Sequence, residues 1–114
     1  MYKPLPEEVT VRKSKIDGLG LFAIKKIEKG HVFGISHISD YRFKNGFIRT
    51  PLGGFINHSE EPNCRLGISH TADYDCLNLI SIKDIPRGTE ITTKYSLYGF
   101  KNEDKQKIKR NSRL

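Results

Sequence analysis

Short apolar runs separated by turn-forming residues are the dominant pattern along this sequence. Ten glycines and five prolines divide the chain, and each apolar run between them is only a few residues long. Runs of this length, bounded by Gly, Pro, Asn and Asp, are typical of β-strands rather than helices. The pattern therefore predicts a mostly β domain built from many short strands.

Six stretches are expected to be strands, because they alternate apolar with polar residues or form a short buried run. They are residues 9–12, 21–24, 32–38, 64–70, 76–82 and 91–95. Within the fifth, Leu77, Leu79 and Ser81 share one face of an alternating pattern. Residues 43–48 predict a hairpin, because their central Asn-Gly pair tolerates the two positive φ angles of a type I′ turn. Only the tail, from about residue 102 to residue 109, has helical composition.

The length of 114 residues suits a single domain. Hydrophobic residues make up 36% of the chain, which is enough for a small core, and no linker or repeat divides it. We therefore expect one domain over residues 1–100 and a separate tail over residues 101–114. No apolar run reaches the roughly 18 residues of a transmembrane helix, and the N-terminal MYKPLPEEV lacks the apolar segment of a signal peptide.

The net charge of +7 is concentrated in the tail. Residues 101–114 hold six Lys or Arg and two Asp or Glu. A basic tail suggests binding to a polyanion, such as nucleic acid or an acidic protein face. The alternative is a solvated chain end that frays and binds nothing.

Four residues with metal-binding side chains follow one another at intervals of six: His58, Cys64, His70 and Cys76. Structural zinc sites use tighter Cys-x2–4-Cys or His-x3–5-His pairs, so this spacing disfavours zinc and no metal is expected. A nucleophilic enzyme built on Cys64 and His58 lacks a third residue to orient the histidine. With no secretion signal, both cysteines are expected to be free thiols.

Three separated motifs are the most specific features of the chain: GLGLFA at residues 18–23, GGFINHSEEPNC at 53–64 and SIKDIPRGTEITTKY at 81–95. In the second, the polar Asn57 follows directly on an apolar pair, and a buried polar side chain must find partners. In this order the motifs resemble the SET domain, the fold of protein-lysine methyltransferases. The resemblance spans residues 9–100, and the compact size is similar to the minimal SET proteins of viruses and bacteria.

This resemblance implies a mostly β SET-domain fold, of the β-clip type, with a C-terminal pseudoknot. There the C-terminal segment passes under a loop, a rare exception to unthreaded topology. It also implies S-adenosyl-L-methionine as the cofactor. The side chain of Asn57 would hold the ammonium or carboxylate end of its methionine part, and the backbone of His58 would bind the adenine edge. Backbone groups at Gly18, Leu19 and Gly20 would contact the methionine part, since glycines let the chain come close to a ligand.

The reaction that the resemblance implies is methyl transfer from a sulfonium to the ε-amine of a protein lysine. The lysine must arrive neutral although its free pKa is about 10.4, and an apolar channel beside the sulfonium charge disfavours the ammonium form. By resemblance, Tyr95 is the active-site tyrosine that orients the amine. Four aromatic residues are candidates for the channel walls, with core packing as the alternative for each: Tyr41, Phe43, Tyr98 and Phe100.

The chain departs from the family pattern at positions that bear on cofactor and substrate binding. Phe33 and His37 stand where a Glu-Tyr pair commonly follows the first long strand. Lys94 replaces the Asp that often precedes the tyrosine. No Cys-x-Cys-x4-Cys follows Tyr95, so the zinc-bound cap of many relatives is not expected. Either a helix in the tail or a second subunit, in a homodimer, would then have to cover the cofactor.

The sequence therefore predicts a protein-lysine N-methyltransferase, with a histone tail as the first substrate to consider. The alternative is a catalytically weak or inactive SET-like module that binds nucleic acid or an acidic protein through its basic tail. Loss of methyl transfer in Tyr95→Phe would favour the first, and loss of a polyanionic partner on deleting residues 101–114 would favour the second. The expected location is the cytoplasm or a host cell interior, nuclear where the host is eukaryotic, with no membrane contact.

Overall fold

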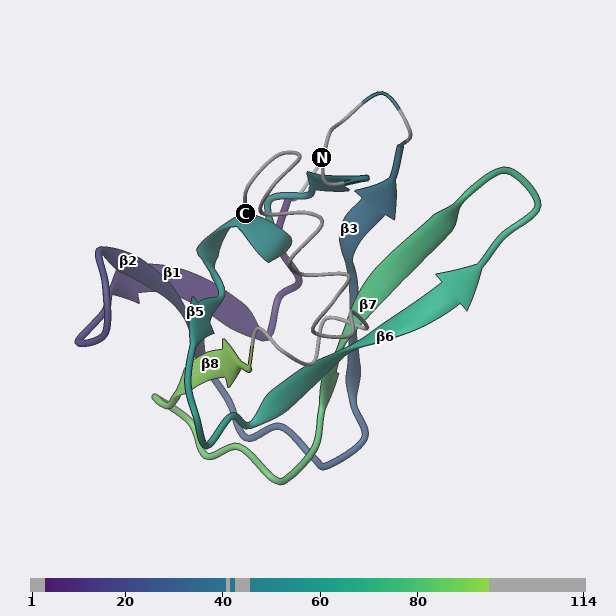
Figure 1. Cartoon of the computed structure of the whole chain (residues 1–114). Coiled ribbons are helices and arrows are strands. Elements are labelled where there is room, and N and C mark those ends of the chain that lie inside the picture. The colour runs from purple at the N-terminus through teal and green to yellow at the C-terminus, as the bar shows by residue number, and fades with distance from the viewer. Residues whose placement is uncertain (1–3, 41, 43–45, 95–114) are drawn as a thin grey trace.

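The computed structural model describes residues 4–40, 42 and 46–94 of the chain. Within these residues the chain forms eight β-strands and one turn of 3₁₀ helix, which confirms the mostly β prediction. In chain order the elements are β1 (Val9–Lys13), β2 (Leu19–Ala23), β3 (Val32–Ser39), β4 (Phe47–Arg49), η1 (Gly53–Phe55), β5 (Asn57–His58), β6 (Cys64–His70), β7 (Asp75–Ser81) and β8 (Glu90–Thr93). Each expected strand overlaps one of these (Figure 1). The predicted pseudoknot and tail helix fall outside the described residues. No helix in the described part is long and apolar enough to span a membrane.

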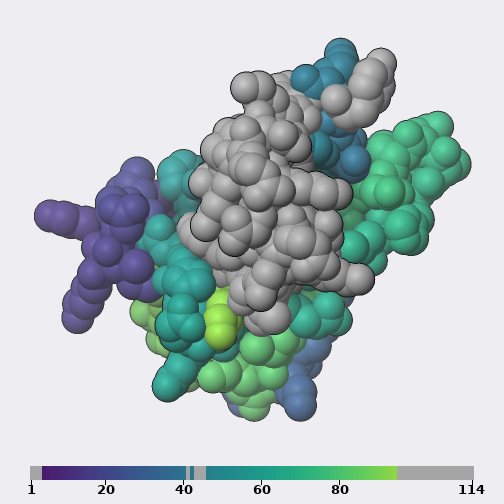
Figure 2. All heavy atoms as spheres, in the orientation of Figure 1, coloured from purple at the N-terminus to yellow at the C-terminus, as the bar shows by residue number. Residues whose placement is uncertain are grey.

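Two four-stranded sheets make up the fold, with strand orders β1-β2-β8-β5 and β4-β3-β7-β6. Neighbouring strands run antiparallel apart from β5 and β8, which are parallel. A parallel pair needs a long connection, and here that connection contains the whole β6–β7 hairpin. In the space-filling view the β1–β2 and β6–β7 hairpins project from opposite sides of the molecule (Figure 2). The parallel pairing places the second sequence motif beside the third.

The β3–β4 hairpin differs from the predicted one. Ser39 pairs with Phe47, whereas a two-residue Asn-Gly turn would pair Phe47 with Lys44. The loop is closed instead by a 2.8 Å hydrogen bond from Asp40 N to Gly46 O. Gly46 does have a positive φ of 83°. The predicted register is wrong because β3 already ends at Ser39, so its connection to β4 is longer than two residues. An Asn-Gly pair favours a tight turn but does not specify the length of the connection around it.

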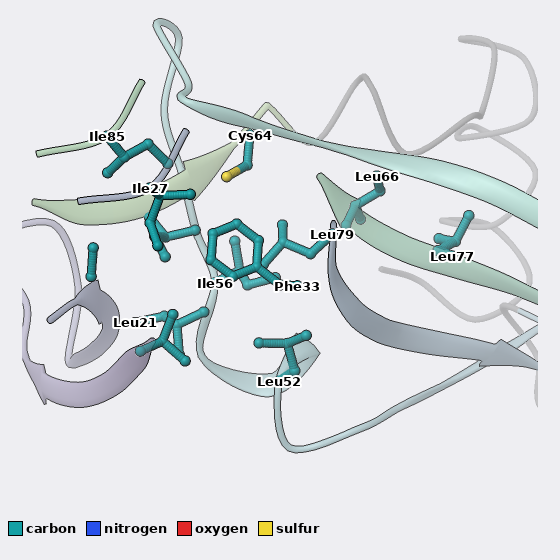
Figure 3. Packing of buried hydrophobic residues seen from close by; sticks show 13 residues of the cluster. Leu21, Ile27, Phe33, Leu52, Ile56, Cys64, Leu66, Leu77, Leu79 and Ile85 are labelled. Carbon is teal, nitrogen blue, oxygen red and sulfur yellow. The ribbon is translucent and has the colours of Figure 1, made fainter. Parts of the chain in front are cut away.

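The two sheets share one hydrophobic core (Figure 3). Leu21 of β2 and Ile91 of β8 contribute to it from one sheet, and Phe33 of β3 and Leu79 of β7 contribute from the other. Leu21, Leu79 and Ile91 are completely buried. Because β2 and β8 are both anchored in this core, the turn before β2 and the first residue of β8 have fixed positions relative to each other.

His37 is a buried polar residue of β3. Ser36 Oγ donates to the carbonyl oxygen of Leu77 at 3.1 Å, so the Ser36 oxygen is left to accept from His37 Nδ1 at 2.9 Å. This arrangement places the proton of a neutral imidazole on Nδ1. Burial, and secondly the positive charge of Arg49, lowers the pKa of His37 from 6.5 to about 4. The folded protein therefore keeps this histidine neutral.

The lowered pKa of His37 predicts that the domain loses stability in mild acid. Between pH 6.5 and about 4 the unfolded chain binds a proton at this residue that the folded chain excludes. The free energy of unfolding should therefore fall with falling pH, by up to about 3 kcal/mol from this residue. His37→Asn keeps a side-chain N–H for Ser36 and removes the titration. In denaturant unfolding at about pH 7.5 and pH 5, this variant should lose less stability than the wild type; an equal loss would contradict the prediction.

Candidate functional site

The turn between β1 and β2 lies against strand β5. The side-chain nitrogen Nδ2 of Asn57 donates to the carbonyl oxygen of Asp17 at 3.1 Å and to that of Leu19 at 3.2 Å. These carbonyls lie 40 and 38 residues earlier in the chain. The first two sequence motifs therefore meet at Asn57, and these carbonyls are partners for its polar side chain.

The third motif reaches the same point through Glu90, the first residue of β8. Glu90 Oε2 accepts a hydrogen bond from Asn57 Nδ2 at 2.8 Å. Its two oxygens also accept from Ser14 Oγ, at 2.8 and 2.9 Å. Ser14 Oγ itself accepts from the backbone N–H of Ile16 at 2.8 Å, so the hydroxyl proton is directed to Glu90. All three motifs thus meet at the contact between Asn57 and Glu90.

Gly18 in the β1–β2 turn and Gly20 in β2 are needed for different reasons. A Cβ atom at Gly20 would overlap the Glu90 carboxylate and would lie 3.1 Å from Ser14 Cβ. At Gly18 the φ of 47° lies in the left-handed region that favours glycine, and no atom lies within 4 Å of where a Cβ would be. The side chain of Leu19, between them, is exposed. The turn is therefore open at Gly18, and β2 is packed against Glu90 at Gly20.

Strand β5 is attached to β8 along its whole length. Asn57 pairs with Thr92 and His58 with Thr93 in parallel register. The backbone N–H of Ser59 continues the ladder by donating to Thr93 O at 2.9 Å. The position of the Asn-His-Ser segment is therefore set by β8, which ends two positions before Tyr95 in the sequence.

Asn63 adds two bonds to this attachment from one side chain. Its Nδ2 donates to Glu90 O at 2.8 Å, and its Oδ1 accepts from Thr92 N at 2.9 Å. The resemblance implies that Asn63 locks the loop after β5, whereas Glu90 and Ser14 are not among the residues that the sequence predicts. Asn63 and Glu90 do lie inside the second and third motifs, and this was the only sequence feature that could have indicated a role for Glu90. No sequence feature indicated a role for Ser14, because its contact with Glu90 joins residues 76 positions apart.

Glu60 connects His58 to the residue that follows β8. His58 Nε2 lies 2.8 Å from one carboxylate oxygen of Glu60, and Lys94 Nζ lies 3.2 Å from the other. The hydrogen bond with His58, followed by that with Lys94, lowers the pKa of Glu60. Lys94, which departs from the family pattern, therefore has an acidic partner within the second motif.

Thr93 carries a buried hydroxyl for which the described part of the chain provides no hydrogen-bond partner. The residue is completely buried, and buried hydroxyls ordinarily have a partner. Thr93 stands two positions before Tyr95 in the sequence. Thr93 shares its face of β8 with the core residue Ile91, so this hydroxyl is enclosed by the protein.

The structure brings half of the predicted site residues together. These are Gly18, Leu19, Gly20, Asn57 and His58. The predicted catalytic and channel residues, Tyr95, Tyr41, Phe43, Tyr98 and Phe100, lie outside the described residues. The described site is therefore the side of the predicted centre where the cofactor is expected.

The rival chemistry based on cysteine is disfavoured by burial. Cys64 and Cys76 are free and buried. Burial raises the pKa of the Cys64 thiol to about 12, so it stays protonated and is a poor nucleophile. Among residues 4–40, 42 and 46–94, no group of three or more His, Cys, Asp or Glu side chains is arranged to hold a metal ion.

Comparison with known families decides the identity of the fold. The SET-domain family model matches residues 34–96, which is more than half of the chain. The chain belongs to the SET-domain family. The match includes the second and third motifs, and it ends one residue after Tyr95.

Relatives of this SET domain include much longer proteins. Over 126 aligned residues it is 31% identical to histone-lysine N-methyltransferase 2D of Homo sapiens, which covers 86% of this chain and 2% of the human protein. Over 45 residues it is 42% identical to histone-lysine N-methyltransferase ASHH2 of Arabidopsis thaliana, covering 40% of this chain and 3% of that protein. The chain thus spans only a few per cent of the length of these curated relatives.

Solved structures share the fold at low sequence identity. A Plasmodium falciparum protein, crystallised as a candidate histone methyltransferase, superposes with a TM-score of 0.67 at 18% identity, covering 80% of this chain and 95% of that one. A humanized mutant of the Chaetomium thermophilum Polycomb Repressive Complex 2, bound to the inhibitor GSK126, gives a TM-score of 0.69 at 21% identity, covering 92% of this chain and 16% of that one. At such identities the likeness establishes the SET-domain fold alone.

Proposed function

We propose that this SET domain transfers a methyl group from S-adenosylmethionine to the ε-amine of a lysine in a protein. The observation that carries the proposal is the meeting of the three motifs at Asn57, in a chain of the SET-domain family. Relatives named as histone-lysine methyltransferases make a histone tail the first substrate to test.

The residues at this junction fit the cofactor that we propose. S-adenosylmethionine brings an adenosine, an amino-acid group and a methyl group already activated on its sulfonium. The open backbone at Gly18 suits close approach of the amino-acid part, and Glu90 supplies a negative charge for its ammonium.

The work left to the protein is mainly positioning, since the cofactor carries an activated methyl group. The junction of Asn57 with the β1–β2 turn would hold the amino-acid part, and the backbone at His58 would hold the adenine edge. Tyr95 would orient the incoming amine by its hydroxyl. A phenol with a pKa of about 10 is a poor base at neutral pH, so Tyr95 is assigned no proton-transfer role.

Calorimetric titration with S-adenosylhomocysteine tests the cofactor site without knowledge of the substrate. The wild type should bind, and Asn57→Ala should weaken binding by about tenfold or more, because a charged or polar ligand group loses its partner. Asn78→Ala is a matched control. Asn78 is also half-buried, and its Nδ2 donates to Ser69 Oγ at 2.7 Å, away from the site.

The same titration separates the proposed function from the rival one. Tyr95→Phe should keep S-adenosylhomocysteine binding and lose methyl transfer to histone peptides. A folded wild-type protein that binds no S-adenosylhomocysteine at millimolar concentration would contradict the proposal. Salt-sensitive binding of nucleic acid that disappears on deleting residues 101–114 would then favour a SET-like binding module.

A further inference from the structure

Glu90 carries a negative charge that no cation balances in the described part of the chain. Glu90 is half-buried, and within the described residues its carboxylate accepts hydrogen bonds only from two neutral groups, Ser14 Oγ and Asn57 Nδ2. Lys13 and Lys15 flank Ser14 in sequence, yet neither forms an ion pair with Glu90. A carboxylate that is partly withdrawn from water is stabilised when a positive charge pairs with it. This site is therefore suited to a ligand that brings a cation.

The orientation of the Asn57 amide points to the same kind of ligand. The two hydrogens of Nδ2 already face three acceptors: the carbonyl oxygens of Asp17 and Leu19, and the Glu90 carboxylate. An amide turned the other way would set its oxygen against all three, so this orientation is fixed by the network. Nδ2 has no hydrogen left for an anionic group. Only Oδ1 remains for a ligand, and Oδ1 can receive a hydrogen bond but cannot donate one.

We infer that Glu90 is a cofactor-recognition residue, whose carboxylate pairs with the α-ammonium of the amino-acid part of the cofactor while orienting Asn57 so that Oδ1 accepts from the same ammonium. The inference rests on the proposed function and deepens it. Of the two charged groups in the amino-acid part of the cofactor, the ammonium and not the carboxylate would bind to Asn57. Gly20 would contribute indirectly, by making space for Glu90. Gly20 leaves room for this carboxylate, which a Cβ atom would displace.

The test compares two ligands in two proteins by calorimetry near neutral pH. The ligands are S-adenosylhomocysteine and its analogue in which hydrogen replaces the α-amino group. The proteins are the wild type and Glu90→Gln, which keeps the shape and can still accept from Asn57 and contact Ser14. Glu90→Gln should weaken binding of S-adenosylhomocysteine by about tenfold, as for the loss of a charge-assisted hydrogen bond. It should leave binding of the desamino analogue unchanged.

The outcomes separate the inference from its premise. Equal weakening for both ligands would mean that Glu90 acts only by supporting the site, and no weakening would mean that it does not act on the ligand; either result overturns the inference. A wild-type protein that binds neither ligand would overturn the proposed function itself. Glu8→Gln, which removes the same charge from a carboxylate paired with His31, should change neither affinity. Thermal unfolding of each variant verifies that it is folded.

Discussion

Gly53→Ala should destabilise the folded domain by about 3 kcal/mol, as overpacking a filled site against backbone typically does. A Cβ atom at Gly53 would overlap the carbonyl oxygen of Ser36 and would lie 3.2 Å from His37 Cε1. That carbonyl oxygen cannot easily move away, because it accepts from Thr50 N at 2.9 Å and from Thr50 Oγ1 at 3.2 Å. The clash is therefore with fixed backbone and not with the free end of a side chain.

The neighbouring Gly54 supplies a matched control for this prediction. No atom lies within 4 Å of a Cβ built at Gly54, so Gly54→Ala should change the free energy of unfolding by less than about 0.5 kcal/mol. Thermal unfolding of the two variants would measure the difference, which should reach about 10 °C or more for a domain of this size. Equal melting temperatures for the two variants would show that η1 does not pack against Ser36 as described.

Most strands of this domain could be predicted from local sequence pattern, but the two-residue strand β5 could not, because it is defined only by its pairing with the distant β8. In residues 76–82 successive side chains take opposite faces, and the structure buries Leu77, Leu79 and Ser81 on one face, together with Cys76 on the other. The hairpin register could not be predicted in this way. The pairing of Ser39 with Phe47 depends on the length of the loop between them, which the Asn-Gly signal does not encode.

The sequence could predict which residues belong to the site, but not the hydrogen bonds and packing contacts between them. The motifs indicate that Gly18, Gly20 and Asn57 act together, and the structure bonds Asn57 to the carbonyls of Asp17 and Leu19, on either side of Gly18. The reason for Gly20 was missed, because the carboxylate that excludes its side chain belongs to Glu90, far along the chain. Likewise, two adjacent glycines, 53 and 54, look alike in sequence, and only the packing of η1 distinguishes them. Contacts between distant segments carry this information, and no local pattern contains it.

Asn57→Asp should be the most damaging conservative substitution in the site. The change puts an oxygen where Nδ2 stands, facing the carbonyl oxygens of Asp17 and Leu19 and the Glu90 carboxylate 2.8 Å away. Two carboxylates and two carbonyls would then face one another without a donor. The loss of stability near pH 7 should be about 2 kcal/mol, because a partly buried donor is replaced by a charged acceptor among other acceptors. Asn57→Ala removes the donor without adding a charge, so it should cost clearly less in chemical denaturation.

Adding Glu90→Gln to Asn57→Asp should recover much of that loss. The amide of the new glutamine can turn its N–H toward the aspartate, which restores a donor and removes one of the two facing charges. The double variant should therefore be more stable than Asn57→Asp alone, even though Glu90→Gln by itself removes a hydrogen-bonded carboxylate. Glu90→Gln would thus stabilise Asn57→Asp although it destabilises the wild type. Such a change in the sign of the effect on stability indicates direct coupling of the two residues, which a double-mutant cycle in denaturant measures. Additive losses in the double variant would show that Asn57 and Glu90 do not share a hydrogen bond, and would remove the basis for assigning both residues to one ammonium.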